Sequence, residues 1–176
     1  MPLIDRTASR LLLIDFQARL MPAISESGAV LANALRLAEA ARLLSVPTLR
    51  TEQYPKGLGP TLPDLAAFGP CIEKTTFSSC GAAAFLAAIA GDHTLVVAGC
   101  EAHVCVLQTV IDLLTLGRRV TVVADAVGTR AALSKTMALE RMRDHGADIV
   151  TTEMVVFEWL QRADIPEFKA VSALIR

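Results

Sequence analysis

Short apolar runs alternate with longer amphipathic segments along the whole chain. Six runs have the length and composition of buried strands, at residues 11–15, 46–51, 71–74, 94–99, 119–124 and 148–151. Patterns with helical periodicity follow them, at residues 28–44, 81–90, 105–116, 134–145, 154–160 and 166–175. Strands and helices that alternate in this order predict an α/β fold with a mostly parallel sheet.

Glycine follows three of the predicted helices, at Gly91, Gly117 and Gly146. Glycine ends helices readily because it adopts the left-handed conformation that closes the last turn. A loop rich in Pro and Gly is predicted at residues 54–63. The chain has no internal repeat and no linker-like stretch, so we expect one domain over residues 1–176.

The composition favours a sheet that is buried on both faces. Hydrophobic residues make up 53% and charged residues 20% of the 176 residues, and the mean hydropathy is +0.47. Such values suit a covered parallel sheet together with an oligomer interface. The predicted helix at 105–116 is apolar nearly all round, which also leads us to expect a homo-oligomer.

Charge and cysteine content bear on partners and compartment. A formal net charge of −1 means that the chain has no excess of positive charge to bind nucleic acid or an acidic membrane surface. The most apolar stretch, at 82–90, is too short for a membrane span. The first residues lack a basic region followed by an apolar run, and the four cysteines show no CxxC spacing. We therefore expect a cytoplasmic protein with reduced thiols and no nucleic-acid or membrane partner.

Three residues with useful chemistry lie where predicted strands end. Asp15 and Lys74 end the first and third strands, and Cys105 follows the fourth at the start of a helix. Ligands of parallel sheets bind beyond the carboxyl ends of the strands, so these residues converge if their strands are neighbours. A helix start is expected to lower the pKa of a thiol. A carboxylate can accept the thiol proton, and an ammonium can hold both charges in place.

Each of the three residues also has an ordinary structural interpretation. An Asp after a strand often caps the next turn, and a lone Lys is usually solvated. A lone Cys in apolar surroundings is more often an inert core residue. Taken singly, these interpretations are favoured; the joint occurrence of Asp15, Lys74 and Cys105 at three strand ends moves the functional interpretation ahead.

The sequences around the three residues resemble those of the isochorismatase-like cysteine hydrolases. The matching segments are LIDFQ (13–17), EKTTFS (73–78) and GCEAHVCVLQT (99–109), with further likeness at 51–55, 123–126 and 138–142. The segment EAHVC (101–105) is most similar to the isochorismatase-domain proteins of unassigned substrate. The resemblance extends over about residues 11–175.

The resemblance implies a fold and an activity. The fold is a Rossmann-like, six-stranded parallel sheet with helices on both faces, in a chain that commonly forms oligomers. The implied catalytic triad maps onto Asp15, Lys74 and Cys105. Members with this triad hydrolyse C–N bonds of small amides, ureides or carbamoyl compounds through a thioester on the cysteine. We therefore expect a small-molecule substrate and no cofactor.

The tetrahedral intermediate of such a reaction carries an oxyanion that needs hydrogen-bond donors. The helix start supplies the backbone N–H of Cys105, and the turn before it must supply a second donor. The resemblance places a cis peptide bond between Cys100 and Glu101, which directs the backbone N–H of Glu101 into the cleft. We therefore predict an oxyanion hole formed by the backbones of Glu101 and Cys105.

Residues beside the predicted catalytic groups are candidates for the walls of the substrate pocket. They are Phe16, Gln17, Tyr54 and Phe77, with Gln53 and Ser78 as further candidates. Aromatic side chains in such places can sandwich a flat substrate. For any one of them, ordinary packing is an equally good interpretation.

No metal site is expected. Cys100, His103 and Cys105 are not accompanied by a second pair of zinc ligands. His103 is expected to point away from Cys105 because the two lie in one tight turn. The segment 51–55 has no histidine, whereas the nicotinamidase branch of the family binds a metal there through an Asp-x-His pair. The isochorismatases proper lack the nucleophilic cysteine, so neither of these two activities is favoured.

Two other classes of function stay open. One is a non-catalytic α/β scaffold that acts by binding partners. The other is a thiol redox protein that uses Cys105, with Cys100 as the nearest second thiol in the sequence.

Overall fold

Six parallel strands form one sheet in the computed structural model, which describes residues 2–175. The strand order is β3-β2-β1-β4-β5-β6, and each neighbouring pair is parallel. The strands are β1 (Ser9–Ile14), β2 (Thr48–Gln53), β3 (Cys71–Lys74), β4 (Thr94–Cys100), β5 (Val120–Gly128) and β6 (Asp148–Val150). The predicted α/β fold is confirmed.

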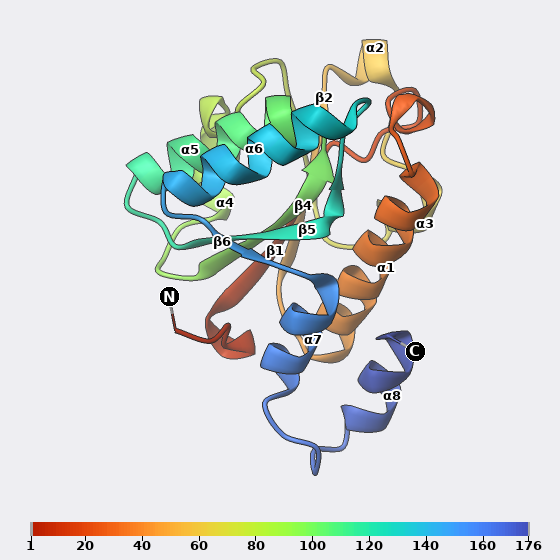
Figure 1. Ribbon diagram of the computed structural model, residues 1–176, viewed down its shortest axis with the longest axis vertical. Helices are drawn as coiled ribbons and strands as arrows, with labels where there is room; N and C mark the ends of the chain where they lie inside the picture. Colours follow the sequence, from red (N-terminus) through yellow and green to blue (C-terminus); the bar gives the residue numbers. More distant parts are fainter. Residues whose placement is uncertain (1, 176) are drawn as a thin grey trace.

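Helices cover both faces of the sheet (Figure 1). One face carries α1 (Ser27–Leu43), α3 (Pro63–Ala66), α7 (Thr152–Leu160) and α8 (Phe168–Ser172); the other carries α4 (Ala83–Ala88), α5 (Leu107–Thr115) and α6 (Ala132–Asp144). The short helix α2 (Pro55–Leu58) follows β2. None of the helices between residues 2 and 175 has the length and apolar character that crossing a bilayer requires.

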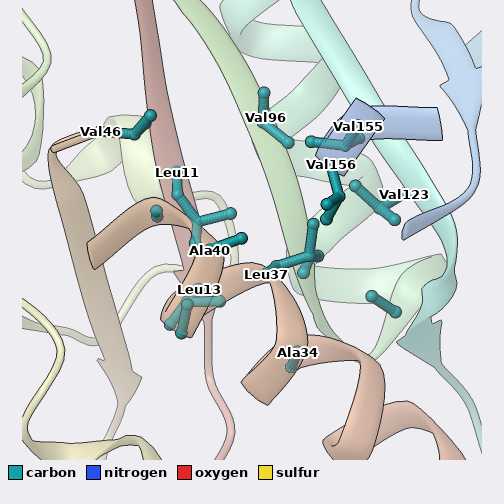
Figure 2. Packing of buried hydrophobic residues seen from close by; sticks show 14 of the residues in the cluster. Leu11, Leu13, Ala34, Leu37, Ala40, Val46, Val96, Val123, Val155 and Val156 are labelled. Carbon is teal, nitrogen blue, oxygen red and sulfur yellow. The ribbon is translucent and has the colours of Figure 1, made fainter. Parts of the chain in front are cut away.

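The hydrophobic core consists of two layers, one on each face of the sheet. Successive strand side chains point to opposite faces, so Leu11 and Leu13 of β1 join one layer while Leu12 and Ile14 join the other. Figure 2 shows the first layer, in which side chains of β1, β4 and β5 meet helices α1 and α7. This two-sided burial accounts for the apolar runs in the sequence.

The main differences from the predicted elements lie in four places, besides shifts of one or two residues at other element ends. Helix α2 lies within the region expected to be a loop, and α3 begins at the last residue of that region, Pro63; each has proline in its first turn, where the missing N–H costs no hydrogen bond. The helix expected from Cys105 begins earlier, with a π-helical turn, η4 (Ala102–Val106), that leads into α5. Strand β5 runs to Gly128, past the expected end at Ala124. At the carboxyl end α8 is shorter than predicted and is followed by a 3₁₀ turn (Ala173–Ile175).

Strands β1 and β4 form the point at which the strand order reverses. The chain leaves β1 toward β2 and β3 on one side and returns to β4 on the other. Gly99 pairs with Ile14 there, and a Cβ on Gly99 would lie 2.4 Å from the carbonyl oxygen of Ile14. The peptide bond between Cys100 and Glu101, at the end of β4, is cis as predicted. Parallel α/β sheets bind their ligands at the crevice beyond such a reversal.

Candidate active site

A buried ion pair joins the ends of β1 and β3. The Nζ of Lys74 lies 2.7 Å from Oδ2 of Asp15, and both side chains are 0% exposed. Asp15 directly follows β1 in a left-handed backbone conformation, with φ of 55°. The other carboxylate oxygen, Oδ1, accepts a hydrogen bond of 2.6 Å from the Thr51 hydroxyl on β2. Both oxygens of Asp15 are thus held by side-chain donors, one from β2 and one from β3.

The ammonium group of Lys74 has acceptors for all three of its N–H bonds. Besides Asp15, it donates to Oε1 of Gln53 at 2.8 Å and to the carbonyl oxygen of Phe77 at 3.1 Å. The carbonyl of Thr76 lies at 3.4 Å as a weaker partner. Lys74 therefore acts as a fixed positive charge and has no N–H left for a ligand.

Gln53 and Gln17 hold this arrangement in place. The Nε2 of Gln53 donates to the carbonyl of Thr75 at 2.8 Å, which fixes Oε1 of Gln53 toward Lys74. The backbone N–H of Gln53 donates to Oε1 of Gln17 at 2.8 Å. The Nε2 of Gln17 donates to the carbonyl oxygens of Gln53 and Gly59 at 3.0 and 2.6 Å.

The Cys105 thiol is buried beside the ion pair, with 6% of the residue exposed. Burial raises the pKa of the Cys105 thiol to about 12; the charge of Asp15 raises it further and that of Lys74 opposes the rise. The pKa of Cys105 is therefore raised, whereas the position at a helix start led us to expect a lowered pKa. Desolvation of the thiol outweighs the field of one helical turn. At neutral pH the thiol is protonated and has a carboxylate beside it.

A cavity of about 300 Å³ opens onto Cys105. Its apolar walls come from Leu20, Ala23, Leu58, Phe77 and Val104, and its polar groups from Gln53, Glu101, Cys105 and Arg130. The volume lies at the lower end of the range for small-molecule sites. The cavity lies beyond the carboxyl ends of the strands, as expected for this class of sheet.

The four predicted pocket residues lie in different places. Phe77 lines the cavity and is 54% exposed, whereas Phe16 is 1% exposed and packs in the core. Gln17 is fully buried in the hydrogen bonds described above. Tyr54 is 53% exposed and lines a second cavity of about 440 Å³, together with Lys56, Glu73, Lys74 and residues of the loop after β3. The structure thus brings only Phe77 of the four to the Cys105 cavity.

Sequence reasoning missed an ion pair at the cavity. The Oε2 atom of Glu101 accepts hydrogen bonds from the backbone N and from Nε of Arg130, at 3.2 and 2.9 Å. Arg130 lies two residues past β5. The expectation that ligands bind beyond the carboxyl ends of the strands, which drew attention to Cys105, therefore also applies to Arg130. The sequence prediction for Glu101 concerns only its backbone N–H. Thr51, the partner of Asp15, carries no sequence signal of its own.

Metal ligands are not gathered at this site. Within residues 2–175 no three His, Cys, Asp or Glu side chains lie close enough together to hold a metal ion. The four cysteines are free thiols, and the Sγ of Cys100 packs 3.6 Å from Sδ of Met21. The Nδ1 of His103 is buried without a hydrogen-bond partner among the described residues.

Known proteins and a family model match the chain over most of its length. The model of the family described as the isochorismatase domain matches residues 9–154. Isochorismatase domain-containing protein 2 of Danio rerio is 40% identical over 170 residues, which are 95% of this chain and 86% of that protein.

Two solved structures share the fold. The MAR1 ribonuclease of Caenorhabditis elegans superposes with a TM-score of 0.94 and 39% identity, over 99% of this chain and 92% of that one. The YcaC gene product of Escherichia coli, described as an octameric hydrolase of unknown specificity, has a TM-score of 0.92 and 26% identity, over 99% of this chain and 91% of that one.

Proposed function

This chain belongs to the isochorismatase domain family, and from that premise we propose that it is a cysteine hydrolase acting on a small amide, ureide or carbamoyl compound. Cys105 is the nucleophile, Asp15 is the proton acceptor and Lys74 is the fixed cation that orients Asp15. The cleaved bond is the C–N bond next to the carbonyl group. No metal or cofactor has a part in the reaction, because side chains and water carry every step.

One observation carries this proposal. A buried thiol, a buried carboxylate and a buried ammonium meet at the strand-order reversal, and the thiol lines a cavity of about 300 Å³. Burying two charges costs free energy unless they are paired and hydrogen-bonded. A titratable group with a perturbed pKa in a cleft, here the Cys105 thiol, is a candidate for a catalytic role. A thiol beside a carboxylate supplies a nucleophile together with its base.

Acylation begins from the protonated thiol. As Sγ of Cys105 attacks the carbonyl carbon, the thiol proton moves to Asp15, a C–S bond forms and the carbonyl oxygen becomes an oxyanion. Because the pKa of the Cys105 thiol is raised to about 12, attack and proton transfer are coupled, and a free thiolate need not accumulate. The intermediate then collapses: the C–N bond breaks, and Asp15 returns the proton to the departing nitrogen, leaving a thioester on Cys105.

Deacylation uses the same base. Water attacks the thioester carbonyl and gives a proton to Asp15; the C–S bond breaks, and Sγ of Cys105 takes that proton back. The products are an amine or ammonia and a carboxylic or carbamic acid. We assign the oxyanion hole in both halves to the backbone N–H groups of Glu101 and Cys105. Phe77, with the apolar walls opposite it, selects a small substrate.

The test is a screen of small amides and ureides for ammonia release, followed by mass spectrometry of the intact protein. Wild-type protein is expected to release ammonia from at least one compound and to carry an acyl or carbamoyl adduct on Cys105. Cys105→Ala should lose both signals with an unchanged circular dichroism spectrum. Cys71→Ser is the matched control, because Cys71 is exposed and does not line the cavity.

The name of the C. elegans neighbour gives a second candidate, cleavage of RNA. A fluorescent RNA is therefore assayed beside the amides, with wild-type protein and Cys105→Ala. RNA cleavage that requires Cys105, without amide hydrolysis, would replace the proposal. Absence of any adduct or turnover would favour a scaffold. A sulfenic acid or disulfide on Cys105 would favour a redox protein.

We also propose that the chain works as a homo-oligomer in the cytoplasm. The YcaC neighbour is described as octameric, and this chain exposes the large apolar side chains of Leu133 and Met137 one turn apart on α6, by 72% and 50%. Exposed apolar groups of this size are commonly covered in assemblies.

A further inference from the structure

The loop that follows β3, residues 75–82, joins Lys74 to helix α5 through hydrogen bonds. Near its start, the carbonyl oxygen of Phe77 accepts a hydrogen bond of 3.1 Å from Nζ of Lys74. Two residues later, the backbone N of Ser79 donates to Oγ1 of Thr109 on α5, at 2.9 Å. Ser79 and Thr109 are both 0% exposed. The loop also supplies the Phe77 wall of the cavity, so its place relative to α5 determines how the cavity is closed.

The same threonine binds the backbone of the residue that carries the thiol. Oγ1 of Thr109 donates to the carbonyl oxygen of Cys105 at 2.6 Å. This contact uses the one proton of the hydroxyl, and the lone pairs of Oγ1 accept from Ser79. Cys105 lies in the π-helical turn η4, a type of turn that is rare and often found at functional sites. The Thr109 hydroxyl thus connects the 75–82 loop to the turn that holds the thiol.

A second threonine on α5 shows which of these contacts is unusual. A threonine hydroxyl commonly donates to the carbonyl four residues earlier in a helix, and Oγ1 of Thr115 donates in this way to Ile111 at 2.9 Å. Thr115 is exposed, and its hydroxyl accepts no hydrogen bond from any of residues 2–175. Thr109 therefore differs from Thr115 in its burial and in the hydrogen bond that it accepts from the loop.

From these contacts we infer that Thr109 is a positioning residue, whose hydroxyl holds the 75–82 loop against the Cys105 turn and so keeps the thiol covered beside Asp15 and Lys74. The inference rests on the proposed function in one respect, because it takes Cys105 as the nucleophile. It adds a residue outside the triad that acts through the backbone of Cys105 and does not line the cavity.

Replacing Thr109 by valine keeps the shape of the side chain and removes the hydroxyl. The buried N–H of Ser79 then lacks an acceptor, and a buried donor without a partner is costly, so the loop is expected to move away from α5 toward water. A second contact between the loop and α5, from Oγ of Ser78 to Oδ2 of Asp112 at 2.5 Å, lies at the surface, where water competes for both groups. Movement of the loop admits water to Cys105, which favours the thiolate, and leaves the thiol less firmly placed beside Asp15.

The first experiment measures the environment of the thiol without turnover. Iodoacetamide alkylates a cysteine: a C–S bond forms, iodide leaves and the thiol proton passes to the solvent. The rate at Cys105 is divided by the rate at the exposed Cys71, and both are read by peptide mass spectrometry in the absence of denaturant. We expect Thr109→Val to raise this normalised rate about tenfold, the effect of lowering the thiol pKa by about one unit.

Two further variants and a stability measurement complete this experiment. Thr109→Ser keeps the hydroxyl and should behave as the wild type does. Thr115→Val removes a hydrogen bond to the carbonyl four residues earlier on the same helix and should leave the normalised rate unchanged. Urea unfolding is measured for each protein, because a role in stability alone would lower the midpoint of Thr109→Val without changing the alkylation rate of the folded protein.

The second experiment uses an amide that the wild-type protein hydrolyses. Thr109→Val should lower kcat about tenfold and change KM less, because the thiol and its base are no longer held together while the cavity still admits the substrate. Thr109→Ser should restore kcat. Faster alkylation combined with slower turnover is specific to a misplaced thiol, since a thiol that was merely more reactive would speed both.

A third measurement needs no variant and therefore stands even if Thr109→Val folds poorly. In wild-type protein the N–H of Ser79, bound to Thr109 and buried, should exchange its hydrogen slowly with water. The N–H of Phe77, which has no acceptor within residues 2–175, should exchange much faster. Both are read by hydrogen-exchange mass spectrometry with fragmentation of the loop peptide.

The outcomes separate the two proposals. Equal normalised alkylation rates in wild type and Thr109→Val, or a Ser79 N–H that exchanges as fast as that of Phe77, overturn the positioning role, whether or not amides are hydrolysed. A rate that rises in Thr109→Val and returns in Thr109→Ser, with no turnover of any amide, supports the positioning role and removes the hydrolase proposal. Hydrolysis with the same kcat in wild type and Thr109→Val leaves the hydrolase standing and removes the positioning role.

Discussion

Replacing Lys74 by methionine tests how much the buried ion pair contributes to the free energy of unfolding. Lys74 and Asp15 are both 0% exposed and lie 2.7 Å apart. Methionine preserves most of the side-chain volume but removes the charge and three hydrogen-bond donors. The Asp15 carboxylate then stays buried with the Thr51 hydroxyl as its remaining side-chain donor, and Oε1 of Gln53 and the carbonyl of Phe77 each lose a partner.

The expected cost follows from these losses. Breaking a buried ion pair by removing one partner costs about 3–5 kcal/mol, and the two abandoned acceptors bring the total toward the upper part of that range. With an m-value of about 3 kcal/mol per M urea for a chain of this size, a loss of about 4.5 kcal/mol moves the unfolding midpoint down by about 1.5 M.

The assay is urea unfolding followed by circular dichroism. Arg42→Met is the control, because Arg42 and Glu39 form an ion pair whose side chains are 58% and 37% exposed, and the midpoint should not move. Adding Asp15→Asn to Lys74→Met should restore about 2 kcal/mol, because the pair is then neutral. A shift below about 0.5 M for Lys74→Met, or a double variant that is less stable than Lys74→Met alone, would refute the reasoning.

Three further predictions concern the Cys105 thiol, the pairing of β1 with β4 at Gly99, and the oligomeric state. Alkylation of Cys105 by iodoacetamide should accelerate about tenfold per pH unit between pH 7 and 10, because its pKa is raised to about 12; a plateau near pH 7, measured by peptide mass spectrometry, would contradict this. Gly99→Ala should cost about 1–3 kcal/mol in urea unfolding, because its Cβ would meet the Ile14 carbonyl at 2.4 Å, whereas Gly28→Ala, with nothing within 4 Å, should not destabilise. Light scattering at micromolar concentration should give a mass above the 18.8 kDa of one chain, and a monomer would be the contrary result.

The strands, and in part the three candidate catalytic positions, were predictable for one physical reason. A parallel sheet that is covered on both faces needs uninterrupted apolar strands, so each strand end shows in the sequence as the first polar or functional residue after such a run. Asp15 is recognisable in that way, whereas Lys74 ends the short, partly polar strand CIEK and Cys105 lies five residues past the end of β4, so these two depended also on the family resemblance. Their mutual contacts depend on the strand order β3-β2-β1-β4, which the alternation of strand and helix does not specify.

The walls of the cavity were less predictable because they depend on backbone turns. Asp15 and Tyr54 have left-handed conformations, with φ of 55° and 38°, and the direction of the chain changes at each. Phe16 follows Asp15 into the core instead of the cavity. Strand β5 runs past its expected end, with a register shift against β4 between Val97 and Gly99, and this extension brings Arg130 beside Glu101.

The charges of the site explain why a buried thiol can be a useful nucleophile. A preformed thiolate would place a third charge beside Asp15 and Lys74, in surroundings that already raise the pKa of the Cys105 thiol to about 12. The protonated thiol avoids that cost and resists oxidation and stray alkylation, since the thiolate is the reactive form. The proposed attack must then be coupled to proton transfer, and Lys74 and Thr51 hold the Asp15 carboxylate beside the thiol through hydrogen bonds. In the proposed mechanism a substrate positioned against this thiol meets the nucleophile and its base together, so the reactivity of Cys105 would depend on binding more than on its resting ionisation.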